Sequence, residues 1–174
     1  VDVAGKYSVR EIFGEALVPL LRDAPLARRV DLHAALRQAR YSGSGAVLAW
    51  KLGAEWQPID SLGLRATRSR DVRAGSLAER YDLSTAGVTI VDTVLAGRPS
   101  YAVISQREGN PAVDPELSDT HTAGIIIRPS GWPGVSLTAD YYDIRIRDVI
   151  ALSGTQNIIN SCAAGNASAC ASER

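Results

Sequence analysis

The feature that most constrains this chain is a two-residue alternation of apolar and polar side chains, which recurs in several long runs. In the clearest run, Leu48, Trp50, Leu52, Ala54 and Trp56 fall on one face of an extended chain, and polar or small residues fall on the other. Successive side chains of a β-strand point to opposite faces of the sheet. Each run therefore predicts a strand with one apolar face.

Six runs of this kind predict strands at residues 7–19, 28–41, 46–58, 62–72, 120–129 and 135–150. Most exceed the length of about 5–6 residues that is common in soluble proteins, and match the roughly 9–11 residues that a tilted strand needs to cross a bilayer. Helical periodicity competes at residues 76–81 and in the first run, where Pro19 and the alternation before it favour a strand. We predict an all-β fold, an antiparallel up-and-down meander of about six long strands that is part of a transmembrane β-barrel.

The connections between these strands give a second signal. Short segments at 20–27, 59–61 and 130–134 contain Pro, Gly or Asp, as turns do. At the other end lie the short segment 42–45, the long segment 73–119 and the open segment 151–174. Short turns at one end and longer loops at the other are typical of outer-membrane barrels.

The alternation changes phase in the last run. After Tyr141 the apolar residues move to Tyr142, Ile144 and Ile146. Either a β-bulge inserts one residue at this point, or the strand leaves the membrane and enters a loop whose outer face is polar. We favour the second explanation.

Composition and motifs argue against several functions. The chain has 19 basic and 19 acidic residues, so its net charge gives no reason to expect binding to nucleic acid. His33 and His121 have no partners at the spacing of a metal or catalytic motif, and the serines lack a nucleophile-elbow pattern. We therefore predict no enzymatic activity, no cofactor and no metal site.

Cys162 and Cys170 are the two cysteines of the chain, and both lie in a stretch of small residues. A local disulfide is the simplest use of the pair and would favour an oxidising compartment such as the periplasm or the cell surface. Two free thiols in a disordered tail are the alternative.

Several motifs resemble those of one protein family, and they occur in family order. Gly-Asn-Pro at 109–111, with Pro-Glu at 115–116 and Ser-Asp-Thr at 118–120, resembles the stretch that leads into a late barrel strand of TonB-dependent receptors. Similar matches are the Asp-Tyr-Tyr of 140–142, the Ser-Val-Arg-Glu of 8–11, the Trp-Lys-Leu-Gly of 50–53 and the Ser-Arg-Asp-Val-Arg-Ala of 69–74. We expect residues 1–174 to be a partial receptor barrel, without the plug domain and the remaining strands.

The resemblance implies an outer-membrane barrel of about 22 strands with a plugged lumen. Such receptors import a scarce nutrient, namely a siderophore, cobalamin, haem or an oligosaccharide. The implied partners are TonB, acting through the plug region, the small-molecule ligand and outer-membrane lipid. The alternative function, from another class, is a soluble secreted β-sandwich that binds carbohydrate. It predicts shorter strands and a polar outer face on each of two sheets.

The resemblance also assigns roles to particular residues. Loop candidates for ligand contact are Arg80, Tyr81, Arg98, Tyr101, Gln106 and Arg107, together with Glu79. Candidates for the lumen-facing wall are Glu11, Glu15, Arg37, Lys51, Glu55 and Arg65. On the opposite face we expect Trp50, Trp56 and Trp132 in the aromatic girdles and Arg68 at the headgroup level, because a charge at the midplane of the lipid face costs about 2–4 kcal/mol.

Overall fold

The computed structural model describes residues 5–93, 95 and 97–172, so the two ends of the predicted fragment lie outside the described residues. The chain divides into two units, residues 7–75 with 114–149 and residues 1–6 with 76–113 and 150–174. None of the helices among the described residues is long and apolar enough to cross a membrane.

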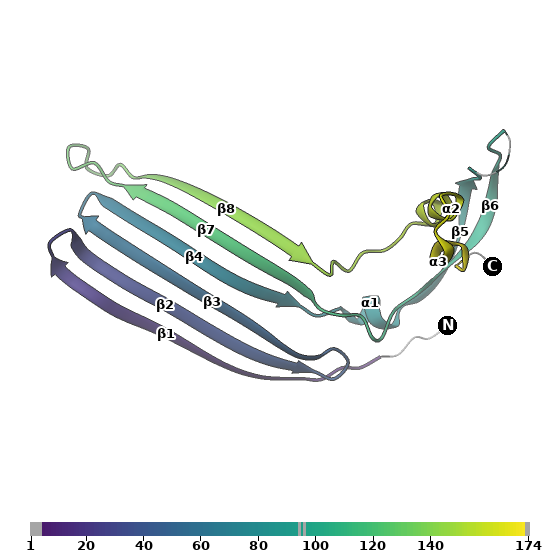
Figure 1. Cartoon of the computed structure of the whole chain (residues 1–174), viewed down its shortest axis with the longest axis horizontal. Helices are drawn as coiled ribbons and strands as arrows, with labels where there is room; N and C mark the ends of the chain where they lie inside the picture. The colour runs from purple at the N-terminus through teal and green to yellow at the C-terminus, as the bar shows by residue number, and fades with distance from the viewer. Residues whose placement is uncertain (1–4, 94, 96, 173–174) are drawn as a thin grey trace. The chain divides into compact units, whose positions relative to one another are not determined.

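The first unit is a six-stranded antiparallel sheet in the order β1-β2-β3-β4-β7-β8 (Figure 1). Its strands span 11 to 16 residues, which confirms the predicted meander of long strands. Their bounds are β1 (Val9–Ala24), β2 (Ala27–Tyr41), β3 (Gly45–Ile59), β4 (Leu62–Arg73), β7 (Glu116–Ile127) and β8 (Leu137–Arg147).

The sheet is a single layer with very little core. Among the described residues, the buried hydrophobic side chains are Ala27, Ala39 and Ile90, and only the first two belong to the sheet. Large apolar side chains are exposed to solvent, with Leu52 57% exposed and Leu36 53% exposed. A β-sandwich buries one face of each sheet against the other, so the alternative of a soluble sandwich module is wrong.

The first turn differs from the prediction. The strand was expected to end at Pro19, with a connection at residues 20–27, but β1 continues to Ala24 and the turn is at residues 25–26. The register shifts between Pro19 and Leu21, so one extra residue is accommodated there as a bulge. Proline lacks the N–H needed for a regular ladder, and the bulge lets the strand continue beyond it.

The phase change in β8 is not a bulge. The pairing of β7 with β8 runs without a shift from Ile127 opposite Leu137 to Leu117 opposite Arg147. The apolar residues after Tyr141 therefore change to the other face of the sheet, and Asp143 and Arg145 occupy the face that was apolar below them. This register excludes the bulge explanation and is compatible with a strand that continues beyond the membrane.

The second unit contains elements that the sequence analysis missed. The segment predicted as one long loop holds α1 (Leu77–Tyr81), in the range where helical periodicity was noted, and a hairpin of β5 (Leu83–Val91) and β6 (Ser100–Glu108). The open C-terminal segment holds α2 (Thr155–Ala163) and α3 (Ala167–Cys170). We call these elements the loop unit, because they come from the connections at one end of the sheet.

Candidate functional site

The alternation defines two faces of the sheet. We call the face that carries Lys51, Glu55 and Arg65 the inner face, and the face that carries Trp50, Leu52 and Trp56 the outer face. The register brings inner-face residues of neighbouring strands opposite one another, as with Glu55 and Arg65. The six residues predicted to face the lumen therefore come from β1 to β4 and share one face.

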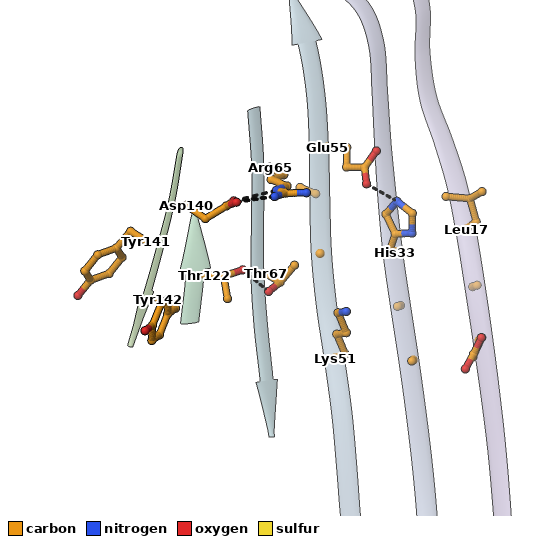
Figure 2. A pocket seen from close by; sticks show the side chains of 16 residues that line it. Leu17, His33, Lys51, Glu55, Arg65, Thr67, Thr122, Asp140, Tyr141 and Tyr142 are labelled. Atoms are coloured by element: carbon orange, nitrogen blue, oxygen red, sulfur yellow. Dashed lines mark hydrogen bonds and ion pairs between the residues drawn. The ribbon is translucent and has the colours of Figure 1, made fainter. Parts of the chain in front are cut away.

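A hollow of about 880 Å³ lies on this inner face (Figure 2). Glu15, Lys51, Glu55 and Arg65 line it, together with polar residues that the sequence analysis had not singled out. The remaining two predicted residues form an ion pair nearby, since Arg37 Nη2 lies 2.5 Å from Glu11 Oε1.

One ion pair in the hollow joins two strands that are not neighbours. Arg65 of β4 makes a bidentate pair with Asp140 of β8, with Nη2 2.6 Å from Oδ2 and Nε 3.0 Å from Oδ1 (Figure 2). Gly124 of β7 lies between them in the register. A Cβ at Gly124 would come within 2.0 Å of Asp140 Oδ1, so glycine is what allows the guanidinium group to reach across β7.

Weaker polar contacts fill the rest of the hollow. Thr67 Oγ1 and Thr122 Oγ1 lie 2.6 Å apart, and His33 Nε2 lies 3.7 Å from Glu55 Oε1 (Figure 2). These charged and hydroxyl groups can form hydrogen bonds with water or with polar groups of a ligand, while Leu17 and Ala54 add apolar surface to the lining. No group of His, Cys, Asp and Glu among the described residues has the arrangement of a metal site.

A buried acidic residue lies near the turn end of the inner face. Asp31 is fully buried, and its carboxylate contacts both Arg29 Nε and Arg22 Nη2, the latter at 2.5 Å. A carboxylate without such partners would be costly to bury. The alternation in the sequence puts Arg29 and Asp31 on one face of the strand. The face on which Arg22 lies could not be predicted, because Arg22 follows the bulge in β1.

Two of the family motifs lie opposite each other on β4 and β7, near the end of the sheet that leads into the loop unit. Arg73 Nε lies 2.6 Å from Glu116 Oε2, and Arg70 Nε lies 2.8 Å from Asp119 Oδ1. The two arginines come from the Ser-Arg-Asp-Val-Arg-Ala segment and the two acids from the Pro-Glu and Ser-Asp-Thr segment. The two segments are thus complementary halves of one strand pair.

The Gly-Asn-Pro segment holds α1 in place within the loop unit. Gly109 N donates to Asp82 O at 2.7 Å and Asn110 N donates to Glu79 O at 2.9 Å. A Cβ at Gly109 would lie 2.5 Å from the Arg80 carbonyl carbon, so only glycine fits this approach. Arg80 itself is 2% exposed, and its Nη1 donates to the Pro111 carbonyl.

The loop candidates fall in two places, α1 and the β5–β6 hairpin. Arg80 and Tyr81 belong to α1, and burial gives Arg80 a structural role in the loop unit. Gln106 and Arg107 lie on β6 opposite Thr85 and Ser84, and Arg98 lies in the turn of the hairpin. Tyr101 donates from its hydroxyl to Asp92 Oδ2 at 2.9 Å.

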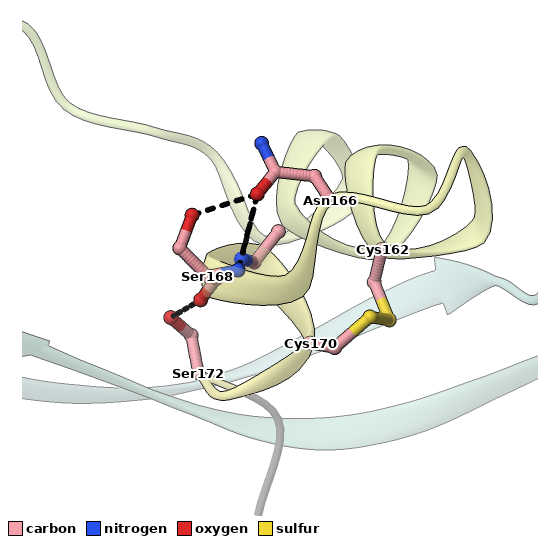
Figure 3. Close-up of a disulfide and its surroundings, with 6 residues drawn as sticks. Cys162, Asn166, Ser168, Cys170 and Ser172 are labelled. Carbon is pink, nitrogen blue, oxygen red and sulfur yellow. Dashed lines mark hydrogen bonds between the residues drawn. A yellow bond between two sulfur atoms is a disulfide. The ribbon is translucent and has the colours of Figure 1, made fainter.

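A disulfide joins Cys162 of α2 to Cys170 of α3 (Figure 3). Asn166 caps α3, since its Oδ1 accepts hydrogen bonds from Ser168 N and Ser168 Oγ. The helix pair is also tied to the hairpin, because Gln156 bonds both backbone groups of Val91 at 2.8 Å. The disulfide therefore fixes an otherwise small folded element within the loop unit.

Comparison with protein families gives a match over residues 2–171 to the family described as TonB dependent receptor-like, beta-barrel. The chain belongs to this family. TonB-dependent receptors are transporters of the outer membrane and are not enzymes, as the sequence predicted. Comparison with curated proteins finds no match.

Solved receptor structures share the fold. The ferric enterobactin receptor PfeA of Pseudomonas aeruginosa, in a mutant form, matches with a TM-score of 0.62 and 17% identity over 81% of this chain. The siderophore receptor PirA of Pseudomonas aeruginosa matches with a TM-score of 0.56 and 18% identity over 78% of the chain, and that of Acinetobacter baumannii with 0.53 and 18% over 79%. The chain covers 18% of the first, 23% of the second and 18% of the third, so it spans about a fifth of these receptors.

Proposed function

We propose that the chain is a wall segment, with its loops, of a TonB-energised receptor that imports a small-molecule nutrient, with a ferric siderophore as the first cargo to test. The observation that carries this proposal is the single-layer sheet with one apolar and one charged face. Such a sheet suits a barrel wall between lipid and a polar lumen. Siderophores are tested before cobalamin, haem and oligosaccharides because the structural relatives are a ferric enterobactin receptor and siderophore receptors.

The outer face is suited to contact with lipid and the inner face to contact with a polar lumen. The outer face exposes Leu36, Leu48 and Leu52, whose apolar side chains lose nothing in lipid. The inner face carries the Arg65–Asp140 pair and the hydroxyls of Thr67 and Thr122. We propose that these inner-face groups, with Glu11, Glu15, Arg37, Lys51 and Glu55, face the lumen and the plug.

The loop unit supplies the candidate ligand contacts. Arg98, Tyr101, Gln106 and Arg107 all lie in the β5–β6 hairpin or its turn, where side chains are open to solvent. Arginine and tyrosine side chains suit an anionic, aromatic ligand, because the guanidinium pairs with oxyanions and stacks on rings. The proposal assigns binding to this hairpin and a supporting role to Arg80.

Uptake measurements test the proposal. Cells that lack the receptor are complemented with the gene, in backgrounds with and without TonB, and the uptake of labelled ferric siderophore, cobalamin, haem and oligosaccharide is measured. We expect TonB-dependent uptake of one cargo, and a reduction of that uptake by Arg98→Ala or Arg107→Ala. Arg128→Ala, in a turn at the opposite end of the sheet, is the matched control. Uptake that does not depend on TonB would overturn the proposal.

A further inference from the structure

The β5–β6 hairpin of the loop unit (Figure 1) is a sheet of two strands, and both of its edges are open among the described residues. An open edge leaves a row of backbone N–H and C=O groups without a partner strand. A hairpin alone is at best marginally stable in water, and a third strand is one way to stabilise it. The edges of the hairpin are therefore the part of the loop unit that a further strand would cover.

The register shows which backbone groups of β5 point away from β6. At the two ends of the hairpin, Gly109 N donates to Asp82 O and Asp92 N donates to Pro99 O. Between these ends the pairing has no shift, and hydrogen-bonded and non-hydrogen-bonded positions alternate in an antiparallel pair. The even-numbered residues of β5 therefore bond to β6. The odd-numbered residues direct their backbone groups outward, and these are Leu83, Thr85, Gly87, Thr89 and Val91.

One outward position already has the hydrogen bonds that a strand would make. The side-chain amide of Gln156 accepts a hydrogen bond from Val91 N and donates one to Val91 O, both at 2.8 Å. Gln156 thus closes the edge at Val91 and limits an added strand to residues 83–89. Thr85, Gly87 and Thr89 are exposed, and nothing lies within 4 Å of a Cβ placed on Gly87. This part of the edge is accessible to another segment.

The strand β5 lacks the features that protect an edge from pairing. Edge strands of soluble proteins are commonly blocked by charged residues, proline or a bulge. The nine residues Leu83–Val91 include no charged residue and no proline, and the pairing with β6 has no bulge. The other edge differs, because β6 carries Arg107 and Glu108. An unprotected edge rich in Val, Ile and Thr is suited to pairing with a further strand.

A loop of the same receptor is the partner that the structure favours. The chain covers 18% of the ferric enterobactin receptor and 23% of a siderophore receptor, so most of a receptor of that length lies outside it. A barrel brings its longer loops together at one end. A segment of the same polypeptide reaches the edge at an effective concentration of about a millimolar, whereas a second receptor molecule must associate from dilution.

We propose that the outward edge of β5 at residues 83–89 pairs with an extended segment of another loop of the same receptor, which adds a third strand to the hairpin. The new strand makes two backbone hydrogen bonds at each of Thr85, Gly87 and Thr89. It thereby fixes the hairpin on which Arg98 and Arg107 lie. The inference rests on the proposed function only for the placement of the chain in a full-length receptor.

Hydrogen exchange resolved to single residues tests the proposal on the purified full-length receptor in detergent. The amides of Thr85, Gly87 and Thr89 are compared with the exchange rates of unstructured amides of the same sequence. We expect exchange at least about a hundredfold slower, because several hydrogen bonds, each contributing about fivefold, must open together. A smaller slowing would overturn the proposal.

A proline variant separates strand pairing from other causes of slow exchange. Thr89→Pro removes an outward N–H and leaves the bonds between β5 and β6, since proline is tolerated where the N–H of an edge strand points outward. We expect the amides of Thr85 and Gly87 to exchange at least about tenfold faster, with the amide of Val88 unchanged. Ala102→Pro is the matched control, because Ala102 lies directly opposite Thr89 and points its N–H outward from β6. Unchanged exchange in Thr89→Pro, or equal acceleration in both variants, would overturn the proposal.

A photoreactive amino acid at position 89 identifies the partner. We expect cross-links within one polypeptide, to a peptide from another loop of the purified receptor. A cross-linked dimer would overturn the assignment to the same molecule. Failure of the uptake test would leave these results unaffected, because neither cargo nor TonB is present in them.

Discussion

Gly109 offers a sharp test of how the loop unit is held together. A Cβ at this position would lie 2.5 Å from the Arg80 carbonyl carbon, 2.5 Å from Tyr81 N and 2.8 Å from Arg80 O. All three atoms belong to the backbone of α1, so no side chain can rotate away to relieve the clash. In Gly109→Ala, either α1 or the Gly-Asn-Pro segment must therefore move.

The magnitude follows from two contributions. Extra atoms in a tightly packed place cost about 1–3 kcal/mol. Movement also weakens the hydrogen bonds from Gly109 N to Asp82 O and from Asn110 N to Glu79 O, each of which contributes about 1 kcal/mol. We expect the free energy of local opening to fall by about 2–3 kcal/mol, which corresponds to an amide exchange in α1 that is about 30-fold to 160-fold faster.

Hydrogen exchange followed by mass spectrometry measures this opening directly in the detergent-solubilised receptor. The matched control is Gly87→Ala on β5 of the same loop unit, where nothing lies within 4 Å of the added Cβ. We expect unchanged exchange of α1 in the control. Unchanged exchange in Gly109→Ala, or the same acceleration in both variants, would refute the argument that backbone contact with Gly109 positions α1.

Three further predictions concern other parts of the chain. Gly124→Ala should separate the Arg65–Asp140 pair and lower the thermal unfolding midpoint of the barrel in detergent, whereas Gly14→Ala, with open space around it, should leave the midpoint unchanged. Reducing the disulfide should destabilise the α2–α3 element by about 2–3 kcal/mol, because the bond closes a loop of 8 residues, and cleavage there by thermolysin should become faster. Ala34→Arg should cost about 2–4 kcal/mol of folding free energy in lipid vesicles, because Ala34 lies on the outer face of β2 midway between Arg28 and Arg40, whereas Ala35→Arg on the inner face should cost little.

Much of the sheet could be predicted from the sequence, because its signal is local. Residues 46–58 alternate so regularly that the strand and its two faces were clear, and β3 has nearly the predicted bounds. The predicted end of a strand was wrong where a contact with a distant part of the sequence determines it. The strand β1 passes Pro19 because a bulge opposite β2 accommodates it, and no pattern within β1 indicates that partner.

The loop unit was much less predictable. The hairpin of β5 and β6 has a Gly-Arg-Pro turn at residues 97–99 and alternating residues such as Val88 and Ile90, but it was hidden inside a segment already assigned as a loop. The helices α2 and α3 are short and rich in small and amide residues with weak helical preference, and the disulfide and the hydrogen bonds of Gln156 hold them in place. Such elements depend on tertiary contacts more than on local propensity.

In the candidate site, too, the local features could be predicted and the long-range contacts could not. Alternation placed Lys51, Glu55 and Arg65 on one face, but it could not say that Arg65 reaches over Gly124 to Asp140. That contact depends on the register of three strands, which links residues far apart in the sequence. The burial of Arg80 was also beyond sequence reasoning, because it depends on the close approach of residues 109–111.

The central claim is that the outer face of the sheet contacts lipid and the inner face contacts a polar lumen. Spin labels placed one at a time at positions 48 to 55 of β3 in the reconstituted receptor test it, with accessibility to oxygen and to a water-soluble nickel complex as the readout. We expect oxygen accessibility to peak at Leu48, Trp50, Leu52 and Ala54, and nickel accessibility to peak at the positions between them. Equal accessibility along the strand, or the opposite phase, would contradict the account.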